Sequence, residues 1–157
     1  METFAEPQAV TDRLVEVAPL SEKIVAMSQA DDGTWVLSFA DGTIVLMEWA
    51  NKPERVVLTS PLGHPPKNRA EELFALCLSF SALSRESCGA RIGLGGEEGE
   101  LMLIRELHHD TAGGWDLLPV LEHFAYVASW WQGVIAEPAQ DSEAHTQGDM
   151  SGMLLRA

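Results

Sequence analysis

An Asp-Gly pair between two apolar, β-prone runs is the feature that most constrains the fold of this chain. Thr34–Phe39 and Thr43–Trp49 are rich in β-branched and aromatic residues, and Asp41-Gly42 lies between them. Such a pair favours the tight turn of a β-hairpin, because glycine accepts the positive φ that this turn requires. Arg55–Thr59 follows after a short turn and has the same composition. The sequence therefore predicts three strands in an antiparallel meander.

The remaining periodic segments place helices on either side of this meander. A second hairpin is expected around the glycine-rich turn at 95–99, and a strand signal at 23–29 is weak. Strands segregated from helices in this way indicate an α+β fold in the order α-β-β-β-α-β-β-α, with helices packed on a twisted antiparallel sheet. The further elements are expected as helices at 6–18, 67–85 and 116–135 and as strands at 90–94 and 100–107.

The helix expected at 67–85 is apolar on two separate faces. At about 100° per residue, one stripe holds Leu73, Leu76, Cys77, Phe80 and Leu83, and a second holds Phe74, Leu78 and Ala82. The sheet of the same chain can cover one stripe, so the other needs another element, another subunit or a ligand. A second copy of the chain is the simplest cover, because the face is then self-complementary. We therefore predict that Phe74, Leu78 and Ala82 lie in a dimer interface.

The composition changes near the end of the last expected helix. Its apolar stripe includes Leu121, Phe124 and Trp131, whereas Tyr126 and Trp130 lie off that stripe. After residue 136 the chain is polar and shows no periodicity up to its last few residues. We therefore predict one domain at 1–136 and a polar, flexible tail at 137–157.

The strong negative charge excludes several kinds of partner. The formal net charge is −14 and the sequence pI is near 4.5, so phosphates and anionic membrane surfaces are repelled. No secretory signal is recognised, and no apolar stretch approaches the roughly 20 residues that span a bilayer. Cys77 and Cys88 form no CxxC motif and are expected to be buried free thiols, which fits a reducing cytosol. These features favour a cytoplasmic protein without nucleic-acid binding or membrane insertion.

The sequence offers little that could build an active site. His108-His109-Asp110 is the only dense cluster of acid–base or metal-binding groups. Adjacent side chains of an extended segment point in opposite directions, and no third ligand has a useful spacing. The glycine-rich turn at 95–99 lacks the residues of a phosphate-binding loop. We therefore expect no catalysis, no cofactor and no metal. A small hydrolase or metal enzyme built on this cluster remains the alternative.

The order of these motifs resembles the class I type III secretion chaperones, the Tir-chaperone or CesT-type family. The resemblance spans about 10–135, and the segments that carry it are DDGTWVLSF, TIVLMEW, RVVLTSPLG, LGHPP, ELFALCLSFSAL, GARIGLGGEEGELMLIREL and VLEHFAYVASWW. It implies a cytoplasmic homodimer that binds the N-terminal, extended segment of a secreted effector without ATP. The secretion-system ATPase or the export apparatus is a further implied partner. A regulator or adaptor that binds a folded partner is the alternative with the same fold.

The resemblance also suggests where an effector binds. Its usual contacts are strand addition to a sheet edge and apolar anchors in surface grooves. We therefore expect an effector-facing surface on the sheet and a groove along the first helix. The other interpretation of these positions is a plain core, since apolar alternation is typical of any half-buried sheet. The residues expected to bind the effector are Trp35, Val45, Met47 and Trp49 on the sheet and Val10, Leu14 and Val17 on the helix.

Overall fold

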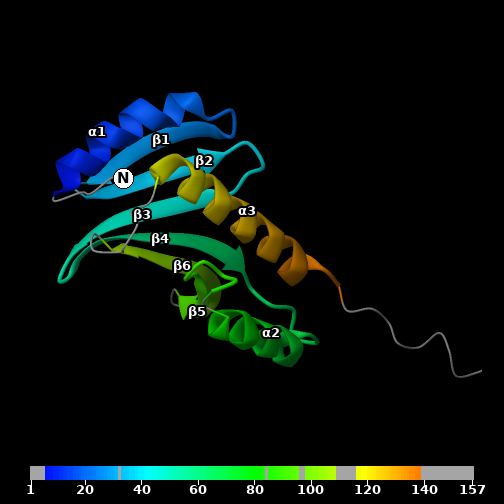
Figure 1. Cartoon of the computed structure of the whole chain (residues 1–157). Helices are drawn as coiled ribbons and strands as arrows, with labels where there is room; N and C mark the ends of the chain where they lie inside the picture. The colour runs from blue at the N-terminus through cyan, green and yellow to red at the C-terminus, as the bar shows by residue number, and fades with distance from the viewer. Residues whose placement is uncertain (1–5, 32, 84, 96–97, 109–115, 139–157) are drawn as a thin grey trace, which may run out of the picture.

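A six-stranded antiparallel sheet forms the frame of the molecule (Figure 1). The computed structural model describes residues 6–31, 33–83, 85–95, 98–108 and 116–138. The sheet has the order β1-β2-β3-β4-β6-β5, which leaves β1 and β5 at its two edges. The strands are β1 (Ile24–Asp31), β2 (Thr34–Phe39), β3 (Ile44–Asn51), β4 (Glu54–Gly63), β5 (Arg91–Gly95) and β6 (Glu100–His108).

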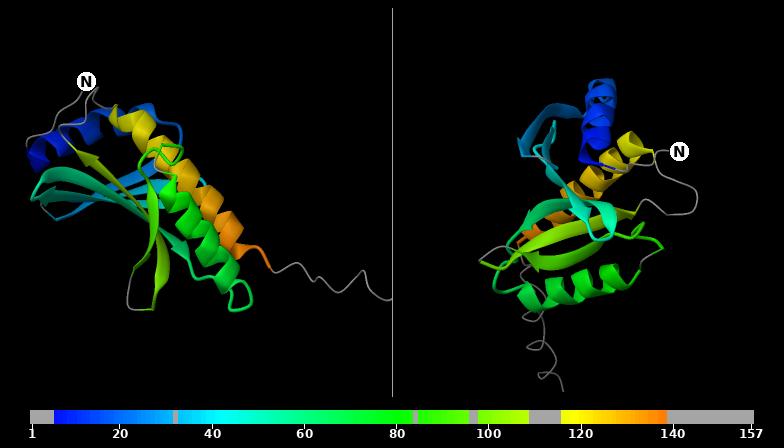
Figure 2. Two further views of the ribbon diagram at one scale, coloured as in Figure 1. Left: turned by 60° about the horizontal axis from the view of Figure 1, so that its bottom comes forward. Right: turned by 90° about the vertical axis from the view of Figure 1, so that its left-hand side faces the viewer.

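The helices are distributed unevenly over this sheet. Two of them, α1 (Pro7–Val17) and α3 (Leu117–Ala136), contact each other, and α3 packs along β4. The short helix η1 (Ala18–Leu20) links α1 to the first strand. The remaining helix, α2 (Ala70–Ala82), lies beside β5 and runs next to the second half of α3 (Figure 2).

Alternating side chains of the strands build the core against α1 and α3. On β2, for example, Trp35, Leu37 and Phe39 are buried, whereas the residues between them are partly exposed. The alternation places every second side chain on the helix-covered face. From α3, Leu121 and Phe124 complete this core.

The α+β class, the antiparallel sheet and the order of the elements are confirmed. The segment with the weak strand signal is β1, so four strands precede α2 and the sheet has six strands. The signal is weak because most side chains of this edge strand are exposed and show no strict alternation. The second hairpin and the last helix lie within one or two residues of their expected bounds.

Two boundaries differ from the expectation. β4 continues to Gly63 through Pro61, where a loop was expected. Proline is tolerated there because the pairing of β4 with β3 ends at Thr59, and the Ile44 carbonyl of β3 accepts a hydrogen bond of 2.7 Å from Ser60 Oγ instead. The middle helix is also shorter than expected, since α2 begins at Ala70 and ends at Ala82.

Part of the predicted organisation lies outside the described residues. These parts are the tail from 139 onward and the two residues His109 and Asp110. Over the described residues, no helix is both long enough and apolar enough to cross a membrane.

Candidate protein-binding surfaces

Six of the seven residues expected to bind an effector are core residues. Val10, Leu14, Val17, Trp35, Val45 and Met47 are at most 2% exposed. They hold α1 on the sheet, and the Trp35 Nε1–H adds a hydrogen bond of 3.1 Å to Thr11 Oγ1. The expectation that these six side chains form an open surface is therefore corrected, and their burial supports the alternative of a plain core.

Trp49 is the member of this set that keeps a partly exposed side chain. Its Nε1–H donates a hydrogen bond of 2.7 Å to Asn51 Oδ1, and its backbone N–H donates one of 2.7 Å to the Gly33 carbonyl. A Cβ added at Gly33 would approach the Cβ of Trp49 to 3.2 Å, and Gly33 also has a φ of +101°. The tryptophan thus packs tightly over the β1–β2 turn.

The outer face of α2 is apolar and open. Leu73 and Cys77 face the core, whereas Phe74, Leu78 and Ala82 are exposed, Leu78 to 71%. This second stripe therefore lies away from the sheet, as the sequence indicates. Leu76 and Leu83 belong to the stripe expected to be buried, but they are exposed as well. The apolar surface of α2 is thus broader than one stripe.

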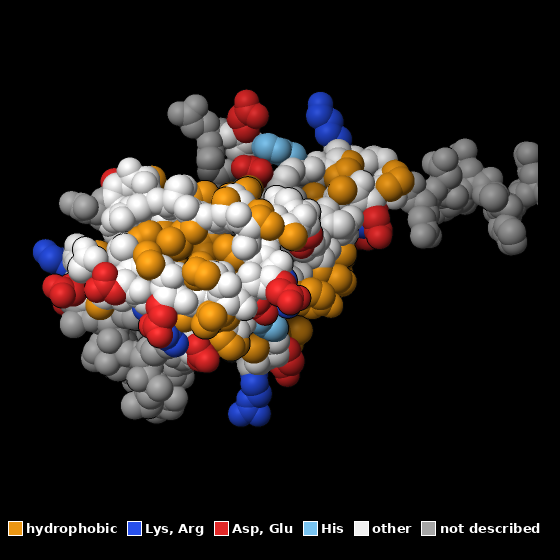
Figure 3. Space-filling model, turned by 90° about the horizontal axis from the view of Figure 1, so that it is seen from above, with side chains coloured by type: hydrophobic (Ala, Val, Ile, Leu, Met, Phe, Trp, Pro, Cys, Tyr) orange, Lys and Arg blue, Asp and Glu red, His pale blue; other side chains and the backbone are white. Residues whose placement is uncertain are grey.

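Most of the free edge of β1 lacks charged residues and proline; a charge enters only at its last residue, Asp31, and the pairing with β2 shifts register near both ends of the strand. Natural edge strands usually bear charged residues or proline, which prevent another strand from adding to them. Residues 24–30 (IVAMSQA) include neither, and Val25 is 63% exposed. Val15 on α1 and Leu20 on η1 are exposed nearby in the chain. Figure 3 shows hydrophobic side chains gathered on the side of the molecule that carries α1 and β1, with acidic side chains around them.

The opposite edge of the sheet is already covered. The backbone N–H of Ile92 on β5 donates a hydrogen bond of 2.9 Å to Ser81 Oγ of α2. The Ser81 hydroxyl in turn lies 3.4 Å from the Ile92 carbonyl. A helix that satisfies the outward backbone groups blocks strand addition. α2 thus covers the β5 edge at Ile92, and the longer β1 is the more open of the two edges.

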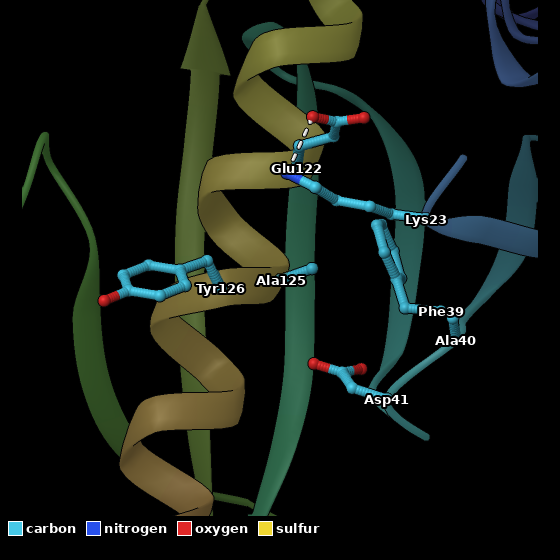
Figure 4. A pocket seen from close by; sticks show the side chains of 7 residues that line it. All are labelled: Lys23, Phe39, Ala40, Asp41, Glu122, Ala125 and Tyr126. Atoms are coloured by element: carbon cyan, nitrogen blue, oxygen red, sulfur yellow. Dashed lines mark hydrogen bonds and ion pairs between the residues drawn. The ribbon is translucent and has the colours of Figure 1, made fainter. Parts of the chain in front are cut away.

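A small cavity lies where β1 begins, between the β2–β3 turn and α3 (Figure 4). Its volume is about 280 Å³, and its lining residues are Lys23, Phe39, Ala40, Asp41, Glu122, Ala125 and Tyr126. Most of the lining is apolar, and Tyr126 on α3 is 67% exposed, with its ring pointing away from the other lining side chains. Acidic side chains lie at two places on the wall.

Hydrogen bonds fix both of these carboxylates. Glu122 accepts from Ser21 Oγ at 2.6 Å and from Lys23 Nζ at 3.1 Å, and these bonds lower its pKa. Asp41 accepts from the Thr43 backbone N–H at 2.9 Å, which is the main reason that the pKa of Asp41 is also lowered. Hydrogen bonds to the ionised form stabilise it, so both groups are charged at neutral pH.

A cross-strand ion cluster occupies the sheet around Glu106. Its carboxylate contacts Arg91 at 2.7 Å, His108 at 3.1 Å and Arg55 at 3.6 Å. The hydrogen bond from Arg91 is the main cause that lowers the pKa of Glu106.

Within the described part of the chain, no three acidic, histidine or cysteine side chains are grouped to hold a metal ion.

The two cysteines lie in different environments. Cys77 is buried as expected, and its burial raises the pKa of its thiol. Cys88 is exposed, with a positive φ of 52°, which corrects the expectation that both thiols are buried. The reason is that Cys88 lies in the turns between α2 and β5, not inside a helix.

The open β1 edge and the cavity were not found among the expected site residues. The signal for the edge was the run 24–30 without charge or proline, which only becomes informative once β1 is known to be an edge strand. The exposure of Tyr126 confirms its expected position off the buried stripe of α3, but this position did not indicate a cavity. The other walls come from three separate segments, so no local pattern identifies them.

The comparisons with known proteins agree with this geometry. The family model described as "Tir chaperone protein (CesT) family" matches residues 23–132. A chain in the crystal structure of the ExsC–ExsE complex is similar with a TM-score of 0.63 and 18% identity, over 82% of this chain and 95% of that chain. A chain in the structure of the HopA1–SchA chaperone–effector complex is similar with a TM-score of 0.54 and 17% identity, over 81% and 89%. No curated protein matches the sequence significantly.

Proposed function

Because this chain belongs to the Tir chaperone protein (CesT) family of type III secretion chaperones, we propose that it binds the N-terminal chaperone-binding segment of an effector and keeps it soluble and export-competent. The observation that carries the binding mode is the open edge of β1, which has neither a charged residue nor a proline from Ile24 to Ala30. An extended segment that pairs with this edge satisfies the backbone groups that β1 leaves free.

Apolar side chains beside the edge supply anchors for such a segment. Val15, Leu20 and Val25 are exposed on α1, η1 and β1, and a partner that covers such apolar side chains lowers the free energy of the complex. Alternate side chains of an added strand point toward the same face, so a segment with every second residue apolar fits this surface. An extended segment suits this edge better than the surface of a folded partner, which makes an adaptor for folded proteins the less favoured function.

The proposed chaperone is a homodimer. The outer face of α2 presents Phe74, Leu78 and Ala82 to solvent, and two copies of this face bury each other's apolar surface. Two β1 edges in one dimer then offer two binding surfaces to one long segment. We propose that the dimer acts in the cytoplasm without a cofactor or catalysis, with the secretion-system ATPase or export apparatus as a later partner.

The proposed function is tested by isolating the chain with its partner from the native cell and then altering the β1 edge. We expect a stoichiometric partner whose N-terminal segment is protected from protease while bound. Val25→Lys should prevent co-purification, because a charge on an edge strand opposes pairing. The matched control is Glu48→Lys, an exposed position on the interior strand β3.

Three outcomes would contradict the proposal. The first is a partner bound only through a folded domain. The second is partner binding that is as strong in a chain carrying both Val25→Lys and Ser28→Lys on β1 as it is in the control Glu48→Lys. The third is a product formed at a steady rate from any molecule co-isolated with the chain.

A further inference from the structure

The cavity at the start of β1 has the chemistry of a side-chain pocket, and we propose that it receives an arginine of the bound segment. This inference rests on the proposed function, because the segment must lie on β1 for the arginine to reach the cavity. The backbone carbonyl of Lys23 accepts a hydrogen bond of 2.8 Å from the Ala40 N–H, so the first residues of β1 and the β2–β3 turn meet at the cavity. Lys23, which immediately precedes β1, also lines the cavity, so the start of β1 lies beside it.

The size of the cavity suits one long side chain. Pockets for drug-sized ligands start at roughly 300 Å³, and this cavity holds about 280 Å³. Its walls are mainly apolar and include the buried Phe39 and Ala125, whereas the ring of Tyr126 points away from them on the other side of α3 (Figure 4). Methylene groups of an arginine pack well on such walls, since long basic side chains bury their stems while the charge stays near water.

The charges at the cavity favour a cation. Asp41 and Glu122 contribute two negative charges and Lys23 one positive charge, which leaves a net negative site. Lys23 is paired with Glu122, whereas Asp41 accepts hydrogen bonds but forms no ion pair with any residue that the structure describes. The carboxylate of Asp41 is therefore available to an incoming cation.

Arginine fits this combination better than lysine. A guanidinium group donates in a planar fork to a carboxylate and also stacks on an aromatic ring. Asp41 provides the carboxylate, and Phe39 is the aromatic side chain that lies on the same side of α3 (Figure 4). The net charge of −14 attracts basic segments in general, so a test must separate the local site from this overall attraction.

The test uses the full-length chain and a phage-displayed library of random peptides as the probe. Peptides selected by the wild-type protein should combine alternating apolar residues with an enriched arginine. The best peptide is then synthesised with arginine and with citrulline, which has the same shape without the charge. We expect citrulline to weaken binding to the wild type about fivefold.

Variants of the chain locate the effect in the cavity. Asp41→Asn keeps an acceptor for the Thr43 N–H and the Asn-Gly turn chemistry, so the hairpin should fold. In Asp41→Asn, arginine and citrulline peptides should bind equally, whereas Glu48→Gln, which removes one charge elsewhere, should keep the full difference. Tyr126→Ala should leave the difference unchanged, since the ring of Tyr126 points away from Asp41 (Figure 4).

The outcomes separate this inference from the proposed function. Selected peptides without arginine enrichment, or a citrulline effect that is unchanged in Asp41→Asn, would overturn the arginine pocket while the β1 edge stands. If binding of the selected peptides is also insensitive to Val25→Lys, they do not lie on β1, and the pocket and the proposed binding mode both fail. A library that yields no peptide above background has the same consequence for both.

Discussion

The ring of Phe80 on α2 meets the ring of Trp131 on α3 edge to face, with centroids 5.3 Å apart and planes at 70°. The same two helices are joined at the start of α2, where Arg69 Nη1 donates to the carbonyls of Val134 at 3.2 Å and Glu137 at 2.6 Å. α2 is therefore attached along its inner side and keeps its outer side toward solvent.

Phe80→Ala should lower the free energy of unfolding by about 2 kcal/mol, because it removes the aromatic contact and leaves space beside Trp131. Urea denaturation followed by tryptophan fluorescence measures the change. Tyr126→Ala on the exposed side of α3 is the control, and it should cost less than about 0.5 kcal/mol. Equal losses in the two variants would show that the Phe80–Trp131 contact does not stabilise the fold.

Leu78→Asp should convert the proposed dimer to a monomer, because it would place a charge in the middle of the proposed apolar interface. Phe74→Asp should act in the same way. Light scattering of the purified protein gives the mass, and circular dichroism checks that the fold is kept. Val15→Asp, on the exposed face of α1, should leave the dimer intact. A dimer that survives both α2 variants would place the interface on another surface.

The periodicity of the chain was sufficient to predict most of the fold. The Asp41-Gly42 turn and its flanking strands appear where the sequence places them, because both strands alternate between core and surface. The two-faced pattern of α2 likewise predicted that Phe74 and Leu78 lie away from the sheet. In both cases the information is local, since one helix turn or one strand pleat determines which side chains share a face.

The candidate site was harder to predict because exposure depends on residues far apart in the chain. Trp35 and Met47 have the composition of a binding surface, but α1 packs over them and makes them core. The open edge of β1 depends on the strand order, and the closed edge of β5 depends on Ser81 of α2. Neither can be read from a local pattern, and the same holds for the cavity around Asp41.

Cys88 should react with a thiol reagent in the folded protein, whereas Cys77 should react only after unfolding. Cys88 is exposed, while Cys77 is buried, and burial raises the pKa of the Cys77 thiol and so lowers its thiolate fraction. Titration with a chromogenic disulfide should therefore show one fast thiol, and Cys88→Ser should remove this fast phase. A fast phase that remains in Cys88→Ser would show that Cys77 is accessible through motion of α2.

Glu106→Gln should weaken the fold at neutral pH and matter progressively less in acid. Arg91 chiefly lowers the pKa of Glu106 below its ordinary value of 4.5. A carboxyl whose folded pKa is lowered stabilises the fold above its unfolded pKa, and this stabilisation is lost as the pH falls through the folded pKa. The difference in free energy of unfolding between wild type and Glu106→Gln should therefore shrink as the pH falls below about 4.5.

Denaturation at a series of pH values measures this difference, and Glu48→Gln is the control variant. A gap that stays constant into acid would mean that the charge of Glu106 does not stabilise the β4–β6–β5 side of the sheet.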